Sequence, residues 1–262
     1  MSLTLDIGAT GMLAQQLNVD TISNNIANMT TTGYKRQRAE FQDLLYQTKI
    51  RAGASSSDAD TTIPVGVQQG LGVKAGAVYR VNEQGPLQST SNPFDIAIKG
   101  RGYFQVTLPS GETAYSRAGA FQLNQNSQMV TAQGYLVQPG ITVPTDAVDV
   151  SINASGQVLV KIQGQATLSN VGQIQTAIFP NEAGLEALGN NLFAITEASG
   201  TATVANPGTD GYGTLEQSFL EASNVNVVQE ITSLIQAQRA YEMNSKVIQT
   251  GDQMMSTITQ LR

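Results

Sequence analysis

Residues 227–255 read VVQEITSLIQAQRAYEMNSKVIQTGDQMM, and apolar side chains recur in this stretch at every seventh position. The repeat consists of Val227, Leu234, Tyr241, Ile248 and Met255, with Ile231 interleaved. A sustained seven-residue apolar repeat is typical of helices that pack along a seam. We therefore expect a long helix from about Leu220 to the end of the chain, with Ser223 or Asn224 as its N-cap.

The N-terminal end carries a matching pattern. Its repeat consists of Leu5, Met12, Val19 and Ile26, with Ile22 and Met29 interleaved. These residues predict a helix from Leu3 to Met29 that stops before the β-branched and glycine-containing stretch at 30–33. The asparagine-rich stretch at 23–28 has low helix propensity, so this helix should depend on packing. Either helix could pack on its own domain, but two matched seams favour pairing of the two ends, with neighbouring subunits covering what that pairing leaves exposed.

The middle of the chain has the pattern of a β domain. Short apolar runs at 94–98, 103–108 and 158–162 are bounded by turn residues, and Pro109–Glu112 and Ala154–Gln157 predict hairpin turns. A short helix is expected at Asn181–Leu188, and residues 34–50 fit either a strand or a short helix. The fold class is therefore α+β: long terminal helices forming a coiled coil, and a central antiparallel β domain resembling a barrel or sandwich.

The expected domain organisation has three parts. The terminal helices, residues 1–33 and 221–262, form one domain, residues 34–72 form a connecting extension, and residues 73–220 form the β-rich outer domain. Within the extension, residues 51–60 are rich in serine and alanine without an apolar period, which predicts a long loop.

The amino-acid composition narrows the range of possible functions. Charged residues make up 13% of the chain, about half the usual share. The net charge of -6 argues against nucleic acid as a partner. The chain lacks cysteine and histidine, which removes thiol chemistry and the commonest general base and metal ligand, so neither cofactor nor metal is expected and an enzyme is disfavoured. No apolar run is long enough to span a membrane, and the first residues do not resemble a cleaved signal peptide.

Three clusters of polar residues have possible chemical roles. Lys99–Phe104 contains a Gly-x-Gly beside basic residues, but the dinucleotide-binding pattern fails at Gln105, so a turn between strands is the better interpretation. Lys35–Arg38 is too short a basic cluster for nucleic acid, and fits a solvated face or a contact to an acidic patch on a neighbouring subunit. Asp58 and Asp60 lie in the predicted loop without further ligands, which favours a solvated loop over a metal site.

Several motifs resemble those of bacterial flagellar rod and hook proteins. The stretch AQQLNVDTISNNIANMTTTGYK at 14–35 is similar to the family's N-terminal signature, and EASNVNV at 221–227 with QAQRAYEMNSK at 236–246 is similar to its C-terminal signature. In the middle, DIAIKGRGYF at 95–104 and YSRAGAF at 115–121 resemble the family's β domain. The segment at 43–73 resembles the extension that sets distal rod subunits apart from hook subunits; a proximal rod paralogue with a β domain is the alternative.

The resemblance implies a non-enzymatic structural subunit of the distal rod, which self-assembles into a helical tube and transmits torque from motor to hook. Its implied partners are further copies of itself, other rod proteins and the hook protein at its ends, the basal-body rings, and the export apparatus. Its implied location is the basal body in the periplasm and through the outer-membrane ring, reached by type III export without a cleaved signal peptide. The twelve repeat residues named above would then form the subunit-assembly seam. The rival from another class is an enzyme or carbohydrate-binding module whose helices only dimerise, which predicts a pocket with convergent polar groups.

Overall fold

The computed structural model describes residues 3–51, 65–164 and 167–260. The predicted loop at residues 51–60 lies, apart from Arg51, outside these ranges, and so do Asp58 and Asp60. The interpretation of those two carboxylates as solvated loop residues therefore stays a prediction.

The chain divides into two compact units. The first, here called the helical unit, consists of Met1–Ile26, Gln37–Tyr79 and Asn226–Arg262. The second, here called the β unit, consists of Ala27–Arg36 and Arg80–Val225. Residues 37–72 of the connecting extension, which was expected to be a region of its own, thus group with the terminal helices, whereas residues 34–36 group with the β unit.

Two long helices occupy the ends of the chain as predicted: α1 (Leu3–Ala27) and α2 (Val227–Gln260). The predicted start of the second helix at about Leu220 is wrong, because Leu220 lies in a strand, Phe219–Glu221. The prediction of Ser223 or Asn224 as the N-cap of α2 is wrong, because Asn226 caps the helix. Its side-chain oxygen accepts the backbone N–H groups of Val228 and Gln229 at 3.1 and 3.3 Å. The Asn224 side chain is engaged within the β unit, where its oxygen accepts the backbone N–H of Arg36 at 2.7 Å.

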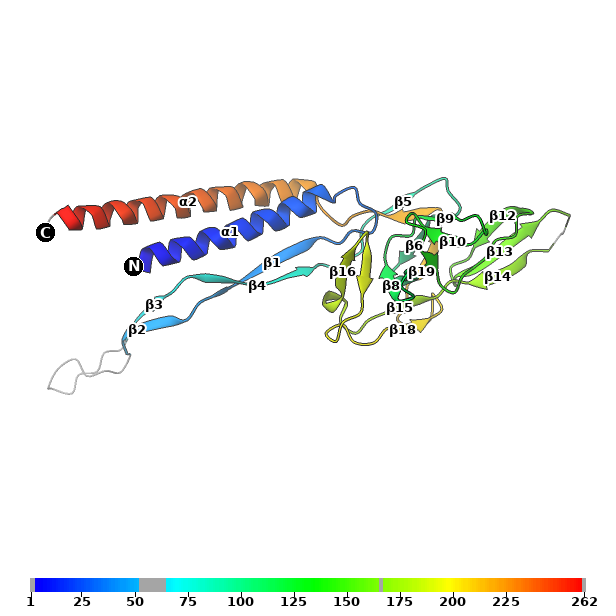
Figure 1. The fold of residues 1–262 in the computed structure, drawn as a ribbon, viewed down its shortest axis with the longest axis horizontal. Coiled ribbons are helices and arrows are strands. Elements are labelled where there is room, and N and C mark those ends of the chain that lie inside the picture. Colours follow the sequence, from blue (N-terminus) through cyan, green and yellow to red (C-terminus); the bar gives the residue numbers. More distant parts are fainter. Residues whose placement is uncertain (1–2, 52–64, 165–166, 261–262) are drawn as a thin grey trace. The chain divides into compact units, whose positions relative to one another are not determined.

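The two helices lie side by side and run antiparallel (Figure 1). Leu5 adjoins Gly251, Gly8 adjoins Ile248, and Gly11 adjoins Asn244, so rising residue numbers on α1 meet falling numbers on α2. Near the other end of α1, Asn25 donates a hydrogen bond to Glu230. The knobs-into-holes packing of a coiled coil stays a prediction.

The helical unit also contains a strand extension. β1 (Gln37–Asp43) pairs with β4 (Val73–Arg80), and β2 (Tyr46–Ile50) pairs antiparallel with β3 (Val67–Gly70). Residues 37–50 are thus strands rather than a helix. The turn before β4 rests on α1, because a Cβ on Gly72 (φ +118°) would collide with the Thr10 hydroxyl.

The β unit contains one short 3-10 helix and the remaining strands. They are β5 (Leu87–Ser89), β6 (Ile96–Lys99), β7 (Tyr103–Thr107), β8 (Thr113–Ser116), β9 (Phe121–Leu123), β10 (Met129–Thr131), β11 (Leu136–Val137), β12 (Ala147–Ile152), β13 (Gln157–Ile162), β14 (Ser169–Gln173), β15 (Thr176–Ile178), η1 (Glu182–Gly184), β16 (Glu186–Gly189), β17 (Leu192–Ala194), β18 (Thr203–Ala205), β19 (Thr214–Gln217) and β20 (Phe219–Glu221).

These strands form antiparallel sheets. The largest, of nine strands, has the order β16-β17-β8-β7-β11-β10-β9, with β15 pairing β7 and β18. A second sheet has the order β12-β13-β14, while β6 pairs with β19 and β5 with β20. The registers are antiparallel, which confirms the predicted antiparallel domain. Closure into a barrel or sandwich stays a prediction.

Both hairpin turns predicted from turn residues are confirmed. The 109–112 turn joins β7 to β8, and the 154–157 turn joins β12 to β13. Gly100 and Gly102, both with positive φ, lie between β6 and β7, as expected for a simple turn. The predicted helix at 181–188 is wrong beyond η1, because Glu186–Gly189 pairs with β17 instead.

Two groups of buried side chains stabilise the β unit. The larger surrounds Phe104, which is fully buried against Phe121 in an edge-to-face contact with ring centroids 5.1 Å apart. The smaller is aromatic: Phe179 lies edge-on to both Tyr103 and Tyr115. The many short strands are held together by the burial of these rings rather than by local strand propensity.

Candidate assembly interface on the terminal helices

The predicted seam residues differ in exposure. Ile22 is buried, and the half-buried members are Leu5, Met12, Val19, Ile26, Val227, Leu234 and Ile248. The exposed members are Met29, Ile231, Tyr241 and Met255. Met29 lies beyond the end of α1, and Met255 lies past the level at which Gly251 faces Leu5. The structure therefore buries, at least in part, most of the α1 repeat and only Val227, Leu234 and Ile248 of the α2 repeat.

A second seven-residue series on α2 faces α1, and sequence analysis missed it. It consists of Glu230, Ala237, Asn244 and Gly251. Glu230, Ala237 and Gly251 are buried and Asn244 is half-buried. A search for apolar periodicity passes over this series, because its members are small or polar. A search for small residues at the same spacing would have found only Ala237 and Gly251.

Glycines bring the two helix backbones close together. A Cβ on Gly8 would lie 2.7 Å from Cγ1 of Ile248, and one on Gly11 would lie 2.8 Å from the Asn244 amide nitrogen. On α2, a Cβ on Gly251 would touch Leu5 at 3.4 Å. Glycine inside a helix costs about 1 kcal/mol relative to alanine. In this helix pair the glycines let large side chains of one helix rest directly on the backbone of the other.

Asn25 joins three segments of the helical unit. It is 1% exposed, and its amide nitrogen donates to the backbone oxygen of Gln37 at 2.8 Å and to Oε2 of Glu230 at 3.1 Å. Its side-chain oxygen accepts the backbone N–H of Gln37 at 2.8 Å. One amide thus holds the end of α1, the first residue of β1 and the first turn of α2. In the asparagine-rich stretch, Asn25 thus stabilises the helical unit through tertiary hydrogen bonds, which helix propensity does not predict.

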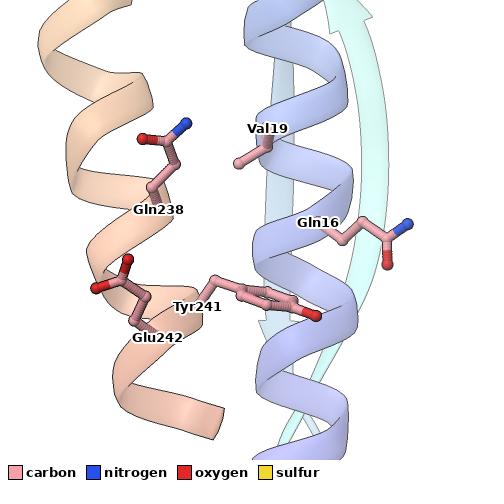
Figure 2. A pocket seen from close by; sticks show the side chains of 5 residues that line it. All are labelled: Gln16, Val19, Gln238, Tyr241 and Glu242. Atoms are coloured by element: carbon pink, nitrogen blue, oxygen red, sulfur yellow. The ribbon is translucent and has the colours of Figure 1, made fainter.

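A groove lies between the helices where no glycine brings them together. It has a volume of about 400 Å³ and is lined by Gln16 and Val19 from α1 and by Gln238, Tyr241 and Glu242 from α2. Figure 2 shows the Tyr241 ring reaching from α2 toward α1, and Val19 directed toward α2. Two predicted seam residues therefore share a groove.

The prediction for Lys35 is wrong. Rather than lying on a solvated face or reaching a neighbouring subunit, Lys35 is buried, and its Nζ lies 2.6 Å from Oε1 of Glu221 in the same chain. Arg117, also buried, places Nε 2.6 Å from Oε2 of the same carboxylate. Glu221 is distant in sequence from both cations, so a local charge count could not reveal the pairing. Arg38, by contrast, is exposed.

The remaining hydrogen bonds of this cluster satisfy its buried charges. Lys35 also donates to the backbone oxygen of Glu83, and the backbone N–H of Gly85 donates to Oε1 of Glu221. The Arg117 guanidinium donates to the backbone oxygens of Ile98, Gly100 and Gly102.

Burial and ion pairing act in opposite directions on these charges. Burial alone raises the pKa of the Glu221 carboxyl, but the charges of Arg117 and Lys35 outweigh it and hold that pKa below 4.5. For Lys35, burial lowers the pKa below 10.5, although the Glu221 charge opposes the shift. The cluster is therefore a structural ion pair network in the β unit.

The β unit has two hollows outside this cluster. One, of about 170 Å³, is lined by polar side chains that include Thr32, Ser116 and Asn191. The other, of about 320 Å³, is lined largely by apolar residues around Phe94 and Val143. Within the described residues, no group of three or more acidic side chains is placed to hold a metal ion. None of the described helices is both long and apolar enough to cross a membrane.

Comparison with known proteins identifies the family. Residues 97–160 match the flagellar hook protein FlgE/F/G D1 domain, residues 216–261 match the C-terminal region of flagellar basal body rod FlgEFG proteins, and residues 5–35 match the flagella basal body rod protein family. The flagellar basal-body rod protein FlgG of Caulobacter vibrioides is 62% identical over 258 residues, covering 98% of each chain. The chain belongs to the FlgG family of flagellar basal-body rod proteins.

Other FlgG proteins are similar over nearly their full length. FlgG of Agrobacterium fabrum is 52% identical, covering 97% of each chain, and FlgG of Bacillus subtilis is 39% identical, covering 100% of each. Among solved structures, the Helicobacter pylori flagellar hook protein FlgE2 matches 71% of this chain and 43% of that chain, with a TM-score of 0.25 and 16% identity. FlgG is the distal rod protein, so this chain is a structural subunit of the distal rod and not an enzyme.

Proposed function

We propose that copies of this chain assemble into a helical tube that transmits torque from motor to hook. The paired helices α1 and α2 form a coiled coil along the inner wall of the tube, and the β unit lies outside. The twelve predicted seam residues carry the inner contacts, and residues 42–72 of the connecting extension wedge between neighbouring copies. Contacts of this kind are heterologous, since only such interfaces generate open helical arrays.

The observation that carries this proposal is the large apolar surface left uncovered on α2. Its exposed large apolar side chains are Val228, Ile231, Ile235, Tyr241, Met243, Val247, Met254 and Met255. A single helix with so many exposed apolar residues indicates an interaction surface. Because α1 already covers the stripe of Ala237 and Gly251, further copies of the chain are the natural partners of the rest.

We infer the partners of the assembly from family membership. At its ends, the assembly meets other rod proteins and the hook protein, and the basal-body rings surround it. The subunit reaches this place in the periplasm, and through the outer-membrane ring, by type III export without a cleaved signal peptide. The support is family membership.

A charged substitution in the helix pair tests the proposal. Ile248→Asp places a carboxylate against Gly8 and should abolish rods, because a buried unpaired charge is strongly destabilising. Gln249→Asp, at the exposed neighbouring position, is the matched control and should leave rods intact. Electron microscopy of hook–basal bodies gives the readout, and the thermal transition of the β unit should not change. Rods of normal length and number with Ile248→Asp would contradict the proposal.

A further inference from the structure

The outer face of α1 carries one apolar side chain between two acidic ones. Asp6, Leu13 and Asp20 follow one another at intervals of seven residues, and all three are exposed, Leu13 by 68%. At about 100° per residue they lie within roughly 40° of arc. α1 contains no lysine or arginine, so this face is purely acidic.

α2 has an exposed face of opposite charge. Arg239, Met243 and Lys246 lie within about 60° of arc at the same angular step, with Val247 beside them. All four are exposed, Met243 by 62%. The exposed Glu242 lies about 40° around the axis from Lys246 and borders the basic region on that side. An apolar centre flanked by two cations thus matches an apolar centre flanked by two carboxylates.

These faces do not meet within one chain. Leu13 lies about 140–180° around α1 from Gly8, Gly11 and Ile22, and Arg239 lies about 120–160° around α2 from Ala237 and Gly251. Those reference residues are on the inner sides of the pair, or buried. Asp6, Asp20, Arg239 and Lys246 make no ion pair within the described part of the chain. Their charges are therefore available to another molecule.

Charge decides between two places where Leu13 could dock. The groove between the helices is apolar, but Glu242 lines it, so the carboxylates flanking Leu13 would meet a like charge there. The Arg239–Lys246 face also has Glu242 at its edge, but its two cations outnumber that carboxylate, so its net charge is opposite to that of the α1 face. Complementary charges of this kind fix the register and suppress the wrong contact more than they add affinity.

We propose that the Asp6–Leu13–Asp20 face of α1 docks on the Arg239–Met243–Lys246 face of α2 in a second copy of the chain. The inference rests on the proposed rod function and names the surfaces that mediate it. Copies in an open array share one polarity, so α1 of one copy runs antiparallel to α2 of the next. Leu13 then contacts Met243, Asp20 approaches Arg239, and Asp6 approaches Lys246.

The spacing is compatible with this docking. Each aspartate lies seven residues, about 10.5 Å, from Leu13, whereas Arg239 and Lys246 lie about 6 and 4.5 Å from Met243 along the axis. The flexible arginine and lysine stems span the remaining distance of about 5 Å. Because the two faces differ and the copies share one polarity, the contact is heterologous and continues from copy to copy.

Cysteine cross-linking tests the contact, since the natural chain contains no cysteine. The double variant Leu13→Cys, Met243→Cys replaces the chromosomal copy, and hook–basal bodies are purified under mild oxidation. A non-reducing immunoblot should show a ladder of dimers, trimers and larger products. Both single variants, and the matched groove variant Leu13→Cys, Gln238→Cys, should show no ladder.

The other outcomes would overturn the inference. A ladder from the Gln238 variant would place Leu13 in the groove, and dimers without larger products would indicate a closed, two-fold contact. Rods that form normally without a Met243 cross-link would reject the contact while leaving the rod function standing. A wild-type chain that is absent from purified rods would instead reject the proposed function.

A charge exchange decides the matter if the cysteine variants fail to assemble. Asp20→Arg and Arg239→Glu should each reduce the number of rods per cell several-fold. The double variant should restore at least half of the wild-type number. A double variant no better than the single ones would overturn the contact.

Discussion

At the scale of the residue, Glu221 shows how one carboxylate organises distant segments. Its backbone oxygen accepts Gly33 N–H at 2.8 Å, and its side chain receives Lys35, Gly85 and Arg117. The carboxylate is what keeps both buried cations paired, and desolvation makes an unpaired buried charge expensive.

Replacing Glu221 should therefore destabilise the β unit strongly. Glu221→Gln leaves two buried cations without a counter-charge and should lower the free energy of unfolding by about 3–5 kcal/mol. Lys35→Met is the control, with an expected loss of about 1 kcal/mol. Its smaller effect follows because Arg117 and Gly85 still donate to Glu221, and Asn224 still donates to the Glu83 oxygen. Urea unfolding followed by near-ultraviolet circular dichroism measures both, and equal losses would contradict this account.

The stability difference between wild type and Glu221→Gln should depend on pH. The folded-state pKa of Glu221 is lowered, so its contribution is fully present above about 4.5, its unfolded value, and is lost as pH falls through the lower folded value. The difference should therefore shrink in acid, where both side chains are neutral. A difference that stays constant well below pH 4.5 would show that the carboxylate charge is not the stabilising feature.

At the scale of the element, the helix pair depends on where its glycines lie. Gly8→Ala and Gly11→Ala gain the same intrinsic helix propensity, about 1 kcal/mol, so their difference isolates the contact with α2. The new Cβ at position 8 meets Cγ1 of Ile248, which the stiff β-branched side chain cannot easily move. At position 11 it meets the terminal amide of Asn244, which can swing away.

We therefore expect Gly8→Ala to lower the yield of hook–basal bodies several-fold. Gly11→Ala should stay close to wild type. Counts of basal bodies per cell and the diameters of swimming halos provide the measurement. Equal behaviour of the two variants would show that the close approach at Gly8 does not matter.

Apolar periodicity was enough to predict both terminal helices, and turn residues were enough to predict the 109–112 and 154–157 hairpins. The errors lie where tertiary contacts override local preference. Strand pairing with β17 displaces the helix expected at 181–188. Asn226 caps α2 because Asn224 is bonded to the Arg36 backbone in the β unit.

At the scale of the whole molecule, the free chain and the assembled rod should differ in the helices alone. In the free chain α2 exposes Ile235, Val247 and other apolar residues, and its contact with α1 is interrupted by the groove at Val19 and Tyr241. Such helices open readily, whereas the buried strands of the β unit do not.

Hydrogen exchange on free protein and on purified rods tests this difference. Amides at 19–26 and 241–255 should exchange fast in the free chain and slowly in rods. Amides of β7 and β13 should be protected in both, which makes them the internal control. Slow exchange of both helix segments in the free chain would show that the helix pair is complete without neighbours.

Part of the interface could be predicted at this scale, and part could not. The apolar seam positions follow from spacing, and half-buried Leu5 and Ile248 lie in the helix pair. The series through Glu230 and Gly251 was missed because it is not apolar. The pairing of Asn25 with Glu230 could not be read from one sequence, since it joins residues 205 positions apart.

The ion pair network around Glu221 also has a mechanical consequence. The chain passes between its two units four times, at residues 26/27, 36/37, 79/80 and 225/226. On the β side, Gly33, Lys35, Glu83, Gly85 and Glu221 all belong to one hydrogen-bonded group near these crossings. The segments that follow or precede the crossings at 36/37, 79/80 and 225/226 are thus fixed to one another within the β unit, so separating one of them from the others requires breaking a buried ion pair or hydrogen bond.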